Sequence, residues 1–180
     1  AYAAPPIQSV PANRQAWVHV SGPCAPGEEG AVFGLGGSGC GGTGTSFDTQ
    51  RIFGPAVLKG VASSSAPCPG IPDGTTCYRL WYVGTNASGV SRIGLAVSPD
   101  GVTWTRVVGS GTGGSVFEAG PAGRFDSSGV TYFSVMRDGD LFKMWYSGYG
   151  SALGTSMTEG IGLATSPDGI NWTRVVGPLA

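Results

Sequence analysis

The sequence predicts an all-β protein, and two observations lead to that prediction. Glycine supplies 33 of the 180 residues, and long runs of strong helix formers are missing. Such a composition is typical of short strands joined by tight turns. In addition, SPDGVTWTRVVG at 98–109 returns as SPDGINWTRVVG at 166–177, with identity at 10 of the 12 positions. A long internal repeat of this kind indicates a propeller, a solenoid or another repeat array.

The repeat extends well beyond this motif. Residues 78–109 match 142–177, with four extra residues in the later copy, and 46–60 match 124–138. Between the matched parts the first copy has a much longer loop, which holds two of the four cysteines. Most of residues 46–177 is therefore two copies of one unit.

Each copy is expected to form four antiparallel strands, the unit of a propeller blade. In the second copy the expected strands are 130–136, 141–147, 160–166 and 170–176. The first two are joined by the tight turn Asp138-Gly139-Asp140. The last two are joined by the SPDG segment at 166–169, where Pro fixes φ and Gly tolerates a positive φ.

A partial third copy of the last strand lies near the start of the chain, at Trp17–Gly22. We therefore expect three parts. An N-terminal arm with an extra outer strand occupies 1–22, a first blade with long cysteine-containing loops 23–109, and a second blade 110–180. The chain begins with Ala1 rather than Met, which is compatible with a mature form and with a fragment.

The four cysteines predict disulfides rather than a metal site. Their number is even, they lie in Gly-, Pro- and Ser-rich loops, and they lack the paired spacing of a zinc site. Three pairings are open, and we favour Cys24–Cys40 and Cys68–Cys77 because each closes a short loop. Two sequons, at Asn86 and Asn171, are candidate glycosylation sites. Together these features predict a secreted or cell-surface protein.

The low charge of the chain excludes some classes of binding partner. Charged residues are 12% of the chain, the net charge is −1, and Lys59 and Lys143 are the only lysines. No basic face for nucleic acid is expected, and no apolar run is long enough to span a membrane. The glycine-rich segment 34–46 lacks the Lys and the following helix of a phosphate-binding loop. We expect no metal and no other cofactor.

The segment FKMWYSGYG at 142–150, followed by IGLATSPDGINWTR and preceded by RFDSSGV, resembles the blades of the five-bladed β-propeller glycoside hydrolases. That group includes arabinanases, β-xylosidases, invertases and mannoside phosphorylases. The resemblance covers about three quarters of the chain and implies propeller blades, with glycoside hydrolysis as the activity if the chain is an enzyme. The SPDGxxW segment is also similar to the Asp-box of sialidase-type propellers, which is a structural hairpin.

The resemblance does not supply a catalytic base. In the arabinanase-type enzymes an Asp precedes a Pro on the innermost strand, but the corresponding positions here read Gly54-Pro55-Ala56 and Tyr132-Phe133-Ser134. The remaining candidates are Asp48 and Asp126 in the repeated FD, with Glu118 near the second. Because both copies keep the FD, a structural role is favoured. The same argument applies to Asp100 and Asp168, and no catalytic residue is expected.

Aromatic pairs offer a second candidate site. Trp81-Tyr82 and Trp145-Tyr146 recur on the second strand of each copy, and propellers that bind sugars stack them on such rings. Adjacent strand residues point to opposite faces, so one member of each pair is expected in the core between blades.

The main functional hypothesis is a secreted, N-glycosylated, non-catalytic structural protein. Its copies would associate through blade faces and strand exchange into a ring, a tube or a filament, because two blades do not close a ring and an unpaired edge strand invites another chain. The alternatives are a lectin-like module that binds carbohydrate and a fragment of a propeller glycoside hydrolase. The expected partners are other copies and, in the lectin case, glycans.

Overall fold

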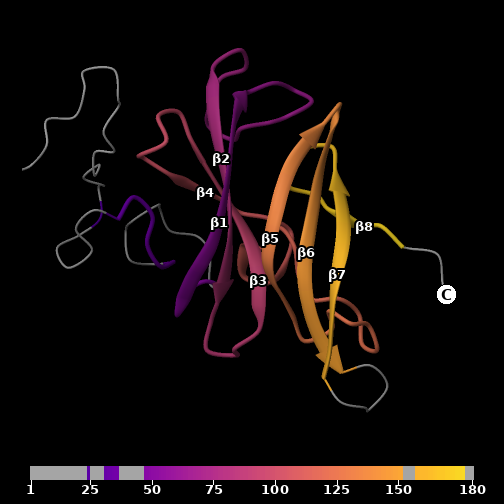
Figure 1. Cartoon of the computed structure of the whole chain (residues 1–180). Coiled ribbons are helices and arrows are strands. Elements are labelled where there is room, and N and C mark those ends of the chain that lie inside the picture. Colours follow the sequence, from indigo (N-terminus) through magenta and orange to yellow (C-terminus); the bar gives the residue numbers. More distant parts are fainter. Residues whose placement is uncertain (1–23, 25–30, 37–46, 152–156, 177–180) are drawn as a thin grey trace, which may run out of the picture.

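The structure is a computed structural model of the 180-residue chain, and it describes residues 24, 31–36, 47–151 and 157–176. These residues form eight strands and one short 3-10 helix, in two four-stranded antiparallel sheets (Figure 1). The all-β prediction with two blades is confirmed. The expected extra strand at Trp17–Gly22 lies outside the described residues. No helix in the described part of the chain is long and apolar enough to cross a membrane.

The first blade consists of β1 (Arg51–Val61), β2 (Thr76–Thr85), β3 (Ser91–Ser98) and β4 (Thr105–Val107). The second blade consists of β5 (Gly129–Asp138), β6 (Leu141–Ser151), β7 (Met157–Ser166) and β8 (Thr173–Arg174). In both sheets neighbouring strands follow the chain order. The connection between the blades contains the 3-10 helix η1 (Thr112–Gly114).

The last strand of the second blade is shorter than the sequence predicts. Strand β8 begins at Thr173, whereas the expected strand begins at 170. The cause is the preceding turn, in which one carboxylate oxygen of Asp168 accepts the backbone N–H groups of Ile170 and Asn171, both at 2.8 Å. These donors are therefore used locally, and pairing with β7 starts after the turn.

The first strand of each blade carries a bulge at the same repeat position. In β1 the register with β2 shifts between Phe53 and Ala56, and in β5 the register with β6 shifts between Thr131 and Phe133. Gly54 has φ +60° inside the first bulge, and Tyr132 has φ +30° inside the second. The bulge bends the first strand of each blade. Beside the two bulges the rings of Phe53 and Tyr132 meet edge to face, with their centroids 6.2 Å apart.

The two sheets pack face to face and share one apolar core, which we call the blade interface. The first blade contributes Trp81, Ile93, Leu95 and Val107, and the second contributes Val130, Val135, Phe142, Met144 and Ala164. A second, smaller cluster lies on the face of the first blade that points away from the second blade, with Phe47, Leu80, Tyr82, Ala96 and Trp104. Each blade therefore has one face in the interface and one outer face.

Candidate functional site

In the first blade, Asp48 belongs to a buried cluster of polar and aromatic side chains. One oxygen of its carboxylate accepts hydrogen bonds from the Tyr82 hydroxyl and from Nε of Arg106, both at 2.9 Å. The Arg106 guanidinium also donates to the Gly34 carbonyl and lies over the Phe33 ring, 4.3 Å from its centroid. Both charged side chains are fully shielded from solvent.

The second blade repeats this cluster around Asp126. The Asp126 carboxylate accepts a hydrogen bond from the Tyr146 hydroxyl at 2.9 Å and another from Nε of Arg174 at 2.7 Å. The Arg174 guanidinium lies over the Phe117 ring at the same 4.3 Å and donates to the Glu118 carbonyl. Two candidate catalytic residues are therefore placed in equivalent positions, one in each blade, and each has its own arginine and tyrosine.

These clusters hold three parts of a blade together. The Asp precedes the first strand, the Tyr lies on the second and the Arg on the fourth. Burial, followed by the charge of Asp48, raises the pKa of Tyr82. Burial and the hydrogen bond to Asp126 raise the pKa of Tyr146 to about 12. Both hydroxyls therefore stay protonated and donate at neutral pH, as a structural cross-link requires.

The arginines are the members of the clusters that sequence reasoning missed. Arg106 is 58 residues from Asp48, and Arg174 is 48 residues from Asp126. The available signal was the conservation of TRVV between the two copies, beside the equally repeated FD. Gly148 shows how tightly the motif is packed, because a Cβ there would meet Cβ of Asp126 at 2.4 Å.

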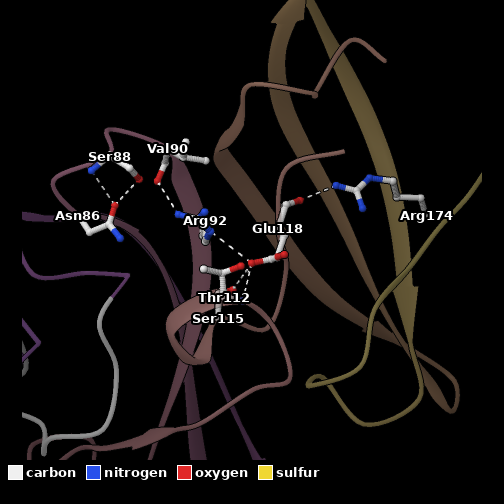
Figure 2. Close-up of polar contacts among 8 residues, drawn as sticks. All are labelled: Asn86, Ser88, Val90, Arg92, Thr112, Ser115, Glu118 and Arg174. Carbon is white, nitrogen blue, oxygen red and sulfur yellow. Dashed lines mark hydrogen bonds and ion pairs between the residues drawn. The ribbon is translucent and has the colours of Figure 1, made fainter. Parts of the chain in front are cut away.

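Glu118, the third catalytic candidate, connects the two blades (Figure 2). Its carboxylate accepts from Nε of Arg92, on β3 of the first blade, at 3.2 Å, and from the Ser115 hydroxyl at 3.2 Å. Its backbone carbonyl accepts from Arg174 of the second blade. Burial raises the pKa of Glu118, but hydrogen bonds from Thr112 and Ser115 and the charge of Arg92 outweigh it, so the pKa is lowered. Glu118 is thus an ionised contact at the blade interface.

The two aromatic pairs are placed differently with respect to the blade interface. Trp81 is completely buried there, and its indole N–H donates to the Gly169 carbonyl at 2.9 Å. Trp145, its counterpart in the second blade, lies on the outer face and is 40% exposed. Tyr82 and Tyr146 point to the other side of their strands, into the Asp–Arg clusters. The alternation expected from strand geometry therefore holds in both copies.

Each outer face is hollowed. A pocket of about 700 Å³ on the first blade has a largely apolar lining, and we call it the first-blade pocket; it includes Val57, Tyr78, Leu80, Gly101 and Trp104. A pocket of about 410 Å³ on the second blade, the second-blade pocket, is more polar and includes Tyr132, Tyr149, Glu159 and Ile161. Both pockets are concave surfaces of the described residues that could hold a ligand or a partner.

The remaining predicted sites are at the periphery. A disulfide joins Cys68 and Cys77, whereas the pairing of Cys24 with Cys40 involves a residue outside the described ones. Asn86 is half-buried in the turn between β2 and β3, and Asn171 is exposed beside Asp168. The described residues contain no group of three His, Cys, Asp or Glu side chains that could hold a metal ion.

Several solved structures have a similar arrangement. A glycosyl hydrolase from Bacteroides ovatus matches with 19% identity and a TM-score of 0.49 over 71% of this chain. A glycoside hydrolase from Parabacteroides distasonis matches with 18% identity and a TM-score of 0.49 over 72%. A structure from work on the GH130 family of mannoside phosphorylases, which contains glycoside hydrolases that target β-1,2 mannosidic linkages in Candida mannan, matches with 18% identity and a TM-score of 0.48 over 72%.

The chain spans only about a third of each of these proteins, 32%, 33% and 32% of their respective lengths. The comparison of structures thus also finds similarity to glycoside hydrolases, for a chain whose described residues form two four-stranded sheets. No family model and no curated protein matches the chain.

Proposed function

We propose that this chain is a secreted, non-catalytic structural protein whose blades associate with the blades of other copies. The observation that carries this proposal is a difference in burial at one repeat position. Ile93 of the first blade is fully buried in the blade interface, whereas Ile161, the same residue in the second blade, is 71% exposed. An isoleucine is costly to leave in water, so the outer face of the second blade has the composition of an interface.

The same contrast recurs at neighbouring positions. Trp81 and Val107 are buried in the blade interface, while their counterparts Trp145 and Val175 are exposed on the outer face of the second blade. Exposed apolar side chains that lie together, rather than scattered singly, are typical of surfaces that bind a partner. Repeat proteins use such faces to stack one unit on the next.

The Asp–Tyr–Arg clusters support a structural role over a catalytic one. Glycoside hydrolysis requires two carboxyl groups that face each other across the substrate. Asp48 and Asp126 instead lie in separate clusters, and each is buried and paired with an arginine of its own blade. Glu118 is engaged with Arg92 at the blade interface.

Light scattering after size-exclusion chromatography tests the proposal directly. Starting from a chain of 18.1 kDa, we expect species of two or more copies whose proportion rises with protein concentration. Electron microscopy of the same fractions would then distinguish closed rings from filaments. A monomer at every concentration up to about 0.1 mM, a concentration at which contacts of micromolar affinity are saturated, would contradict the proposal.

Secretion is supported by the disulfide between Cys68 and Cys77 and by the exposed sequon at Asn171. Expression in a secreting eukaryotic host should yield a glycoprotein in the medium. Enzymatic removal of N-glycans should reduce its apparent mass, and Asn171→Gln should remove part of that difference. A protein that is retained in the cytosol with reduced cysteines would contradict this part of the proposal.

Carbohydrate binding is the second candidate function, and the second-blade pocket is the observation that favours it. The pocket combines Tyr132 and Tyr149 with the carboxylate of Glu159, the mixture of aromatic and hydrogen-bonding groups that sugars require. Glycan-array binding that Tyr132→Ala abolishes in a monomeric protein would favour this function over assembly. Turnover of aryl glycosides would indicate a glycoside hydrolase.

A further inference from the structure

We propose that Trp145 of one copy inserts into the first-blade pocket of a second copy and donates its indole N–H to the Gly101 carbonyl there. This inference rests on the self-assembly proposed above and specifies the contact that produces it. The partner is another copy of this chain, because the chain already contains one example of the same contact between its own two blades.

That example is the site of Trp81 in the blade interface. Its indole donates to the Gly169 carbonyl at 2.9 Å. Its ring packs against Phe142, with centroids 5.6 Å apart, and meets Trp172 edge to face at 6.3 Å. The second strand of one blade thus places a tryptophan against the second strand, the SPDG turn and the closing tryptophan of the next blade.

The first blade carries identical or similar residues at the corresponding positions. The strand registers place Tyr78 opposite Ser98 as they place Phe142 opposite Ser166, so Tyr78 corresponds to Phe142. By the same alignment Leu80 corresponds to Met144, Gly101 to Gly169 and Trp104 to Trp172. All four first-blade residues line the first-blade pocket.

The backbone of the two sites also agrees. Gly101 and Gly169 have φ of +79° and +77°, so both turns adopt the same left-handed conformation. In both turns the Ser hydroxyl, of Ser98 or Ser166, accepts the glycine N–H at 2.8 Å. The Gly101 turn is therefore built like the turn that accepts Trp81.

An unsatisfied donor lies beside the first-blade pocket. In the blade interface the Gly169 carbonyl accepts from the indole N–H of Trp172, at 3.0 Å, as well as from Trp81. In the first blade the corresponding Nε1 of Trp104 is buried and has no acceptor among the described residues. A buried donor without an acceptor destabilises the fold, so among the described residues this face lacks a hydrogen bond that its counterpart in the blade interface has.

The outer face of the second blade offers the matching surface. Trp145 is exposed there on β6, and Ile161 is exposed on the adjacent strand β7. The counterpart of Ile161 in the first blade is Ile93. In the blade interface Ile93 also forms hydrogen bonds through its backbone. Its N–H donates to the Phe117 carbonyl and its carbonyl accepts from the Val116 N–H, both at 2.9 Å.

The corresponding backbone segment of the next copy is Val32–Phe33. The ring centroids of Phe33 and Tyr82 are 4.8 Å apart, and those of Phe117 and Tyr146 are 4.9 Å apart. We therefore place the backbone of Ile161 beside Val32 and Phe33 of the second copy. Because the two surfaces belong to different blades, the contact is head to tail, and it produces a ring or a filament rather than an isolated symmetric dimer.

Two variants test the two sides of the contact separately. Trp145→Ala removes the inserted ring, and we expect it to weaken association at least about 30-fold, as is usual for a central aromatic anchor. Val57→Lys places a charge in the first-blade pocket. Val57 is 50% exposed, so the monomer should tolerate the substitution while association is lost.

The matched control is Val176→Ala. Val176 is exposed in the second blade, and its counterpart Val108 is exposed as well although the first blade is covered by the second. This position therefore lies outside the blade contact, and association should be unchanged. Trp145→Phe keeps an aromatic ring, smaller than the indole and without its N–H, and should weaken association less than Trp145→Ala.

Mixing the two variants provides the sharpest test. Each variant alone should be monomeric at 18.1 kDa. Together, the intact Trp145 of the Val57→Lys variant can enter the intact pocket of the Trp145→Ala variant, so a 1:1 dimer should form and extend no further. Circular dichroism and thermal unfolding of each variant verify that both monomers are folded.

The outcomes distinguish the contact from the assembly. If the unmodified chain is monomeric, self-assembly itself is refuted and the contact with it. If the unmodified chain assembles and Trp145→Ala assembles equally well, the contact is refuted while self-assembly stands. If both variants are folded monomers and no mixed dimer forms, the head-to-tail arrangement is refuted.

Discussion

The two blades carry nearly the same cluster in different surroundings. In the first blade the Arg106 and Asp48 side chains are both fully buried. In the second, Asp126 is equally buried but 30% of the Arg174 side chain is exposed. The distances within the clusters hardly differ, so each cluster is set by its own blade. Exposure differs because it depends on what covers the blade, and the comparison separates these two effects.

The largest expected effect is the loss of a cluster arginine. Arg106→Met leaves the Asp48 carboxylate buried without its cation, and should lower the free energy of unfolding by about 3–5 kcal/mol. Arg174→Met should cost less, about 1–3 kcal/mol, because solvent already reaches that side chain. Urea unfolding with the disulfides intact measures both values.

The exposed Arg124 provides the control for charge removal. Arg124→Met should change the free energy of unfolding by no more than about 0.5 kcal/mol. Equal losses for Arg106→Met and Arg174→Met would mean that the surroundings of a blade do not influence its cluster, and the comparison would fail.

A smaller effect is expected at the glycines of the two SPDG turns. Alanine at either Gly101 or Gly169 must adopt a positive φ, which costs about 1–2 kcal/mol. At Gly169 a Cβ would also meet the Trp81 ring at 2.9 Å, whereas at Gly101 the nearest atom is 3.6 Å away in Tyr78. Overpacking should therefore add about 1 kcal/mol or more to Gly169→Ala.

Thermal unfolding of the two alanine variants at a concentration that keeps the protein monomeric checks this difference. Association adds a second expectation. If Trp145 of another copy packs on Gly101, the Gly101→Ala variant should approach the Gly169→Ala variant in its loss of stability once the protein assembles. Identical losses in the monomer would contradict the assignment of Trp81 to the Gly169 turn.

Local signals in the sequence were sufficient for the blades and their turns. The SPDG turns and the disulfide between Cys68 and Cys77 were predicted because each involves residues close together in the chain. The Asp48–Arg106 pairing was missed because it joins residues 58 positions apart. The length of β8 was wrong because strand propensity does not report that Asp168 already accepts the N–H groups of 170 and 171.

Burial was the part that neither composition nor periodicity could predict. Trp81 and Trp145 both precede a tyrosine, and Ile93 and Ile161 both precede Gly-Leu-Ala, yet one member of each pair is buried and the other exposed. A strand pattern indicates which side chains share a face, but the presence of a neighbour decides whether that face is covered. The outer faces therefore emerged only from the three-dimensional arrangement.

The smallest expected effect concerns the pH dependence of the two SPDG turns. Hydrogen bonds from the backbone of Thr103 and Val102 lower the pKa of Asp100 from 3.8 to about 2. The pKa of Asp168 is also lowered, but its burial acts in the opposite direction. A carboxyl group whose pKa is depressed by folding stabilises the fold above its unfolded pKa. That contribution is lost as the pH falls through the folded value.

Stability should therefore decline between about pH 4 and pH 2, and Asp100→Asn should flatten this decline more than Asp168→Asn does. Melting temperatures measured from pH 6 to pH 2 test the difference. At pH 6 each Asn variant should lose some stability, since a neutral amide oxygen is a weaker acceptor for two backbone N–H groups. A melting profile that Asp100→Asn leaves as steep as that of the unmodified protein would mean that the Asp100 carboxylate does not hold its turn. The repeated motif would then owe its conformation to the serine and glycine of each SPDG turn alone.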